Sequence, residues 1–229
     1  MVKPVQMPLD LGGGPSYAAD DFLVADSNRD AFSMIEGRGA WPSFALALVG
    51  PAGSGKTHLA NLFVGGNGDS YAQAEALIDD MVDDLADRKE VVIEDVDRGV
   101  DEPALLHLFN LLRERGRHLL VTGREAPARW SIALPDLRSR LAALPVVTIG
   151  PPDEALLAAL MIKLFADRQL RIGQELPAYL LPRLERSFAA VRAAVAALDQ
   201  AALSKGRPVT PALAREVLGL GVTPDLWDE

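Results

Sequence analysis

The stretch 44–64 constrains the fold more than any other part of the chain. The apolar run FALALV at 44–49 is followed by GPAGSGKT at 50–57, and residues that favour a helix continue to about 64. A continuous apolar run of this length is typical of a strand that is buried on both faces. The eight residues match the phosphate-loop pattern GxxxxGK[ST] at every fixed position, between the strand and the helix that the pattern requires. The sequence therefore predicts a parallel sheet covered by helices, with a phosphate site at one strand end.

The chemistry of this loop indicates a nucleotide. Glycines let successive backbone N–H groups turn toward phosphate oxygens, and the following helix adds the positive end of its dipole. Lys56 supplies a cation for the outer phosphates, and the hydroxyl of Thr57 is a ligand for Mg²⁺. We therefore expect ADP or ATP with Mg²⁺. The expected contacts in the loop are Gly50, Pro51, Ala52, Gly53, Ser54, Gly55, Lys56 and Thr57.

Two acids follow the next buried strand, VVI at 91–93. We expect Glu94 to hold Mg²⁺ and Asp95 to orient or deprotonate an attacking water. An Asp usually comes first in such a pair, and Glu94 is one methylene longer. Metal geometry and hydrolytic competence stay open for this reason, and we expect weak or no intrinsic ATPase.

Strands alternate with helices up to residue 150, and only helices follow. Helices are predicted at 27–36, 57–64, 72–87, 102–115 and 137–143, and strands at 44–49, 91–93, 118–122 and 146–149. The helix at 72–87 rests on an apolar stripe, opposite a row of Asp residues. After Gly150 and two prolines, helices are predicted at 153–167, 176–185, 187–203 and 211–218. The predicted domains are an extended tail (1–15), an α/β nucleotide-binding domain with helices on both faces of the sheet (16–150), and a small all-helical lid domain (151–229).

Composition narrows the class of partner and of site. The chain has 23 Lys and Arg against 32 Asp and Glu, a net charge of −9, which argues against non-specific binding to nucleic-acid phosphates. The absence of cysteine excludes disulfides, thiolate metal sites and a Cys nucleophile. No apolar run approaches the roughly 18 residues of a membrane span, and no leader peptide is evident. We expect a soluble, cytoplasmic protein.

Several further segments give the chain a resemblance to the AAA+ superfamily, and within it to the DnaA clade, over about 6–218. GKTHLA at 55–60 resembles the exit of the clade's phosphate loop, which adds His58 to the expected contacts. LLVTG at 119–123 resembles its sensor-1 strand, with Thr122 as the sensor; Arg124 and Glu125 stand where the family tends to have Asp and then Arg. AVRAAVAAL at 190–198 resembles the sensor-2 helix, with Arg192 as the sensor. Phe22 and Leu23 fall in a segment that resembles the border of the adenine site.

Two other segments extend the resemblance, the first to the DnaA clade and the second to the DnaA-related proteins that inactivate DnaA. LPDLRSRL at 134–141 resembles the arginine-finger segment, with Arg140 as the finger. QMPLDL at 6–11 resembles a sliding-clamp motif, in which Gln6 fills a polar niche and Met7, Leu9 and Leu11 meet an apolar pocket. Members of this branch lack the DnaA DNA-binding domain, and this chain likewise ends after the predicted lid.

The resemblance implies negative regulation of replication initiation. The implied partners are DnaA and the β sliding clamp of DNA polymerase III, and a homodimer is compatible with it. The protein, with ADP as the favoured nucleotide, would present Arg140 to the ATP of DnaA, and no sequence-specific DNA or membrane binding is expected. A DNA-stimulated AAA+ ATPase, such as a helicase loader or transposition helper, is the alternative.

Overall fold

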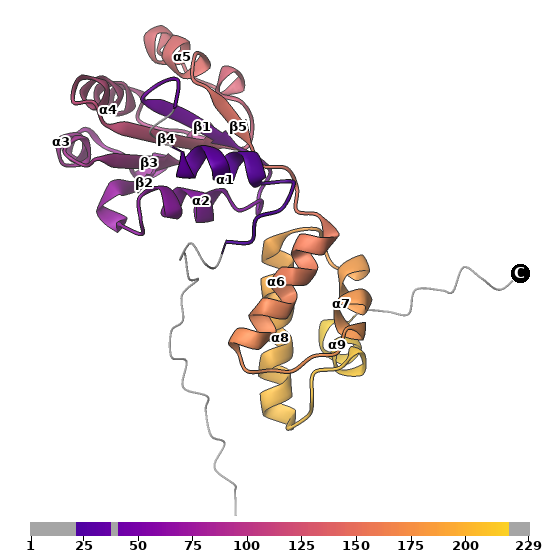
Figure 1. Ribbon diagram of the computed structural model, residues 1–229. Helices are drawn as coiled ribbons and strands as arrows, with labels where there is room; N and C mark the ends of the chain where they lie inside the picture. Colours follow the sequence, from indigo (N-terminus) through magenta and orange to yellow (C-terminus); the bar gives the residue numbers. More distant parts are fainter. Residues whose placement is uncertain (1–21, 38–40, 220–229) are drawn as a thin grey trace, which may run out of the picture.

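The computed structural model describes residues 22–37 and 41–219 (Figure 1). The predicted tail, with Gln6, Met7, Leu9 and Leu11, lies outside these residues. No helix among the described residues has both the length and the apolar character that crossing a membrane demands. The helices are α1 (Arg29–Glu36), α2 (Lys56–Phe63), α3 (Val82–Ala86), α4 (Glu102–Glu114), α5 (Pro135–Ala142), α6 (Glu154–Asp167), α7 (Glu175–Leu180), α8 (Phe188–Lys205) and α9 (Pro211–Leu218), and the strands are β1 (Ala45–Val49), β2 (Tyr71–Gln73), β3 (Glu90–Glu94), β4 (His118–Gly123) and β5 (Val146–Thr148).

The described strands form one parallel sheet in the order β2-β3-β4-β1-β5. The chain passes from β1 to the far edge at β2, and later crosses from β4 over β1 to β5. The carboxyl ends of β1, β3 and β4 therefore meet at one edge, which is where open α/β sheets bind ligands. The register brings Val49 opposite Gly123 at that edge.

Helices cover both faces of the sheet, as predicted. Along β1, Leu46 and Leu48 pack with α1 and α2, while Ala45 and Ala47 pack with α3, α4 and α5. Side chains alternate between the two faces of a strand, so a strand covered on both sides needs apolar residues at every position. This explains the uninterrupted apolar run that precedes the phosphate loop.

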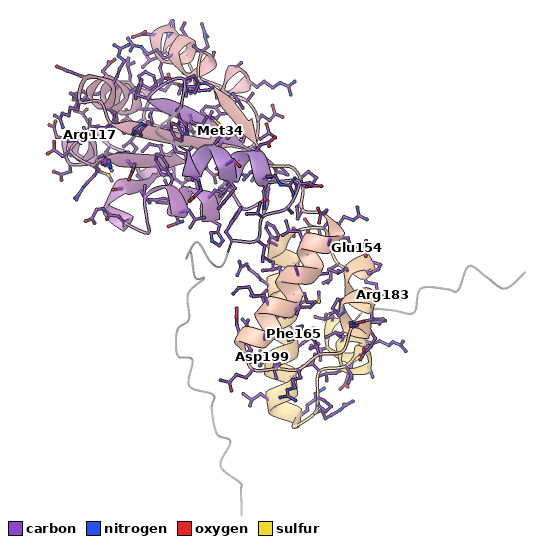
Figure 2. All side chains as sticks on the ribbon, viewed as in Figure 1. Met34, Arg117, Glu154, Phe165, Arg183 and Asp199 are labelled. Carbon is purple, nitrogen blue, oxygen red and sulfur yellow. The ribbon has the colours of Figure 1, made fainter. Side chains whose placement is uncertain are left out.

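The helices after residue 150 form a group apart from the sheet (Figure 1) and have a hydrophobic core of their own. Figure 2 shows Phe165 among the side chains of this helical part. Met161 and Phe165 of α6 pack there with Val191 and Val195 of α8. Helices α6 and α8 begin at side-chain caps: the Asp153 carboxylate accepts the Leu156 N–H, and the Ser187 hydroxyl oxygen accepts the Ala190 N–H. The fold class is thus the predicted one, an α/β layer followed by helices.

The helix predicted at 72–87 is wrong. The segment begins with β2, continues through two short 3₁₀ turns and becomes helical only at α3. Tyr71 and Ala72 pair with β3, so their backbone hydrogen bonds go to the sheet. Leu77, Val82 and Leu85 are buried as expected, but Ile78 is 52% exposed, so the stripe does not lie on one helix face. A strand therefore exists where the sequence predicted none.

Candidate nucleotide-binding site

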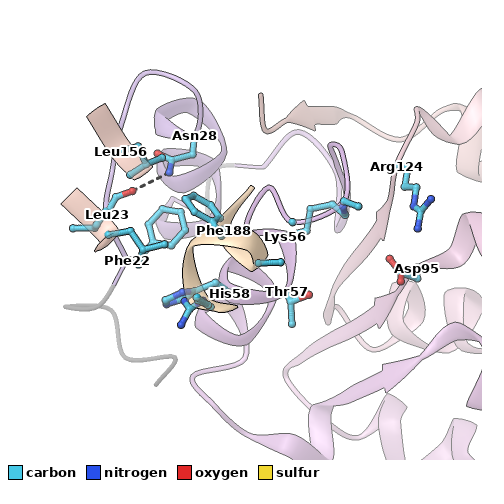
Figure 3. A pocket seen from close by; sticks show the side chains of 16 residues that line it. Phe22, Leu23, Asn28, Lys56, Thr57, His58, Asp95, Arg124, Leu156 and Phe188 are labelled. Atoms are coloured by element: carbon cyan, nitrogen blue, oxygen red, sulfur yellow. Dashed lines mark hydrogen bonds between the residues drawn. The ribbon is translucent and has the colours of Figure 1, made fainter. Parts of the chain in front are cut away.

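A cavity of about 450 Å³ lies where the sheet edge meets the helical part. Six segments line it: the stretch before α1, the phosphate loop with the start of α2, the carboxyl end of β3, the carboxyl end of β4, the first turns of α6, and the start of α8. Figure 3 shows these side chains around the opening. The lining residues are Phe22, Leu23, Asn28, Ala52, Gly53, Gly55, Lys56, Thr57, His58, Asp95, Arg124, Leu156, Leu160, Phe188, Ala189 and Arg192.

The phosphate loop needs its glycines for backbone shape and for space. Gly53 and Gly55 have φ angles of +69° and +100°, which L side chains rarely adopt. A Cβ on Gly50 would lie 2.6 Å from the carbonyl oxygen of Ile149. Gly55 is also the residue before α2, so the loop delivers the N–H groups of the first helical turn to the cavity.

Lys56 is held inside this loop. Its Nζ donates hydrogen bonds to the carbonyl oxygens of Gly50 (2.7 Å) and Pro51 (3.0 Å). Burial lowers the pKa of Lys56, against the opposing pull of Asp95, Asp97 and Glu94. A buried cation that carries a desolvation cost gains from contact with an anion. The loop therefore holds a buried positive charge where the sequence predicts a phosphate site.

Thr57 and Glu94 form the other polar pair of the loop. The Thr57 hydroxyl donates to Glu94 Oε1 at 2.6 Å, and Gln73 Nε2 at the end of β2 donates to Glu94 Oε2 at 3.1 Å. Burial raises the pKa of Glu94, and the hydrogen bond from Thr57 partly counters this. The longer Glu side chain thus does reach the hydroxyl of Thr57, the other predicted ligand for Mg²⁺.

The hydroxyl oxygen of Thr57 and the Oε1 oxygen of Glu94 are suitable ligands for Mg²⁺. Hydroxyl and carboxylate oxygens are the hard ligands it prefers, and it usually keeps waters and substrate phosphates as its remaining ligands. Within 22–37 and 41–219, no group of three or more His, Asp or Glu residues could hold a metal ion by itself. Any Mg²⁺ here would therefore depend on bound phosphates.

Asp95 lies at the cavity in a strained conformation. Its φ is +56°, unusual for a residue other than glycine, and its N–H donates to the Thr122 hydroxyl oxygen at 3.0 Å. Its carboxylate pairs with Arg98 Nη1 at 3.2 Å. Thr122 is fully buried and does not line the cavity, so its contact to the site runs through the backbone of Asp95.

The other end of the cavity is an apolar slot. The Phe22 ring meets the His58 ring edge-on, with centroids 5.1 Å apart. Asn28 fixes the segment that carries Phe22, because its side chain donates to the Leu23 carbonyl (2.9 Å) and accepts the Ala25 N–H (2.8 Å). Leu156, Leu160 and Phe188 complete the slot from the helical part. Its shape and chemistry suit a flat aromatic base.

The geometry has counterparts among solved structures, although no family model matches the sequence. Domain III of the replication initiation protein DnaA from Thermotoga maritima is similar over 92% of this chain and 99% of its own, with 21% identity and a TM-score of 0.76. The chain has a DnaA-like AAA+ fold. AMPPCP-bound DnaA from Aquifex aeolicus is similar over 80% of this chain and 65% of its own (17%, TM-score 0.67). The Holliday junction branch migration motor RuvB of Thermotoga maritima is similar over 89% of this chain and 72% of its own, with 14% identity and a TM-score of 0.70.

Within this DnaA-like fold, most of the predicted nucleotide contacts come together. Phe22, Leu23, His58, Asp95 and Arg192 line the cavity together with five of the eight loop residues. The predicted contacts that do not line it are Gly50, Pro51, Ser54, Glu94 and Thr122. Sequence reasoning missed Arg124, Leu156, Leu160, Phe188 and Ala189. The sequence did hold a signal for Phe188: the Ser187 cap marks the start of a helix, and Phe188 lies four residues before Arg192 on the same face of that helix.

Arg140 lies in α5, outside the cavity. Its Nε and Nη2 donate to the two carboxylate oxygens of Asp136 (2.8 and 3.0 Å), and its Nη1 donates to Asn110 Oδ1 (2.7 Å). Its side chain is 24% exposed, whereas Arg138 is exposed and has no ion pair with a described residue. The guanidinium is therefore held in one orientation at the surface of the AAA+ core.

Proposed function

We propose that this chain is a nucleotide-binding regulator of the Hda type, which resembles DnaA and acts on it. The observation that carries the proposal is a phosphate loop bordering a cavity that residues of α6 and α8 also line, in a fold similar to domain III of DnaA over 92% of this chain. The nucleotide is ADP or ATP with Mg²⁺.

The lining residues suggest how the nucleotide binds. The base enters the slot beside Phe22, and the phosphates take N–H groups of the loop, with Lys56 as counter-charge. Arg192 reaches the same cavity from the lid and adds a second cation. Thr57 and Glu94 would hold Mg²⁺, which when bound neutralises charge on the outer phosphates.

Intrinsic hydrolysis should be weak. Asp95 is the candidate for orienting a water, but Arg98 already engages its carboxylate. An arginine that holds one of the carboxylate oxygens competes with a water for that carboxylate. The protein would then act chiefly on the site of a partner.

The partner proposed is DnaA in its ATP form, reached through the β sliding clamp. Gln6, Met7, Leu9 and Leu11 are the proposed clamp contacts. Arg140 is the proposed finger for the γ-phosphate of the ATP on DnaA. An arginine supplied in trans is worth roughly 10³–10⁵ in rate in well-studied cases. Its support by Asp136 and Asn110 favours this role, because a fixed guanidinium loses little freedom when it meets phosphate.

The experiment is single-turnover hydrolysis of labelled ATP preloaded on DnaA, with clamp on DNA and this protein in excess. The wild type should accelerate hydrolysis, and Arg140→Ala should lose the acceleration by orders of magnitude while its nucleotide affinity stays unchanged. Arg138→Ala, two residues away on the same helix, is the matched control and should act like the wild type. A wild-type rate with Arg140→Ala would rule out the finger role.

Clamp binding has its own test. Replacing Gln6 and Leu9 together by Ala should abolish retention on immobilised β clamp and leave the melting temperature nearly unchanged, because a tail contributes little to a core. Undiminished retention of the double variant would contradict the proposed motif.

The similarity to RuvB favours one alternative, a motor driven by its own ATP hydrolysis. Steady-state ATP turnover with and without single-stranded DNA separates the two. A large stimulation by DNA would favour the motor, and slow turnover that DNA does not change would favour the regulator.

A further inference from the structure

Arg124 stands at the end of the cavity opposite the base slot. It follows β4 directly, at the sheet edge that also carries the phosphate loop. In Figure 3 the slot residues Phe22 and Leu23 lie at one side, Lys56 lies between, and Arg124 lies beyond it, directed toward Asp95. A nucleotide with its base in the slot and its phosphates on the loop extends toward this end.

The backbone around Arg124 is fixed on both sides. Its N–H donates to Asp97 Oδ2 at 2.9 Å. The preceding Gly123 packs under Trp130, since a Cβ there would lie 2.7 Å from Trp130 Cζ2. The Trp130 indole N–H donates to the Glu125 carbonyl at 2.7 Å, and Trp130 is itself buried. Arg124 is therefore delivered to the cavity from a rigid position.

The side chain of Arg124 has no anionic partner among the described residues. It is exposed, and Asp95, the acid it faces, is paired with Arg98. Arg124 also adds to the positive field at Lys56 and helps to lower the Lys56 pKa. With Arg192 from the lid, three cations border one cavity, an arrangement that an anion of high charge would relieve.

We infer that Arg124 binds the terminal phosphate of a nucleoside triphosphate, so that it raises the affinity of the site for triphosphates relative to diphosphates. The inference rests on the proposed nucleotide binding and goes beyond it, because it names the residue that distinguishes a triphosphate from a diphosphate. The planar fork of arginine can place two parallel hydrogen bonds on one phosphate group. A diphosphate, which is one phosphate shorter, would leave this end of the cavity without an anion.

The test is equilibrium binding of ADP and of AMPPCP, each with Mg²⁺, to the full chain and its variants. Arg124→Gln should weaken AMPPCP binding about 10- to 100-fold, the range for a lost hydrogen bond between charged groups, and change ADP binding little. The AMPPCP affinity of Arg124→Lys should lie between those of the wild type and Arg124→Gln, since lysine keeps the charge and lacks the planar fork of arginine. Arg129→Gln is the matched control: Arg129 follows in the same loop, is exposed, pairs with Glu125 and does not line the cavity.

The outcomes separate this inference from the proposed function. Equal loss of ADP and AMPPCP affinity in Arg124→Gln, or no loss of either, overturns the inference and leaves nucleotide binding in place. A wild type that binds neither ligand overturns the proposed function itself. A selective loss of AMPPCP affinity that Arg129→Gln does not share supports the inference.

Discussion

Replacing Lys56 by Met tests the site through thermal stability. The substitution keeps an apolar stem and removes the ammonium group that donates to the Gly50 and Pro51 carbonyls. Without ligand, two effects oppose each other: a buried charge disappears, and two carbonyl oxygens lose their donor. We therefore expect the melting temperature of the unliganded variant to lie close to that of the wild type.

With nucleotide the two proteins should differ. At a hundredfold excess over Kd, binding stabilises the fold by about 2.7 kcal/mol. Loss of a charged contact to phosphate weakens binding by roughly 100-fold, which leaves about 0.4 kcal/mol at the same concentration. For a chain of this size each kcal/mol moves the melting temperature by about 2–4 °C. The wild type should therefore gain about 5–11 °C, and Lys56→Met about 1–2 °C.

Differential scanning fluorimetry with ADP and with ATP measures both shifts. Lys89→Met is the matched control, because Lys89 is exposed in the turn before β3, far from the cavity. It should keep the full nucleotide response. A wild type that does not respond to either nucleotide, or a Lys56→Met protein with the full response, would refute the phosphate-loop reasoning.

Three further substitutions test other parts of the site. Glu94→Gln removes a carboxyl whose pKa is raised above 4.5 by burial. The wild type therefore loses stability as pH rises from about 4.5 through the raised pKa, and the variant does not. Urea titrations should show the free energy of unfolding of the variant rising relative to that of the wild type over this pH window, and a constant difference would contradict the shift. Gly55→Ala, at a φ of +100° with Phe188 only 3.4 Å from the new Cβ, should cost about 1–3 kcal/mol and abolish the nucleotide response, whereas Gly65→Ala, at +61° in open space, should keep the response. Ser187→Ala removes the cap of α8 and should lower the melting temperature by about 2–4 °C, from a loss of about 1 kcal/mol, while Ser187→Thr should recover most of it.

The sheet and its phosphate loop were predictable because their signals are local. A strand buried on both faces needs apolar residues throughout, and a phosphate loop needs glycines at fixed positions. The segment 44–57 has both patterns, so it predicts the strand and the loop that follows it. The segment 71–86 gave the wrong prediction because β2 has three residues, too few for a periodic pattern. Its tertiary pairing with β3 overrode the helical spacing of the apolar residues that follow.

The far walls of the cavity could not be predicted in the same way. Leu160 and Phe188 belong to the apolar pattern of their helices, and sequence alone does not say which apolar residue borders a cavity and which fills a core. At the position of Arg124 the DnaA clade, which the sequence resembles, tends to have Asp, and only the place of Arg124 at the end of β4 brings it to the site. Thr122 illustrates the converse: the motif suggests a ligand contact, and the structure turns its hydroxyl toward the backbone of Asp95.

The length of α8 has a mechanical consequence. Its first two turns border the cavity through Phe188 and Arg192, and its 18 residues, about 27 Å, run through the core of the helical part. A reorientation of about 10° at the cavity end would swing the Lys205 end by about 5 Å. Any tilt of α8 that accompanied ligand binding would therefore be larger at the Lys205 end than at the cavity.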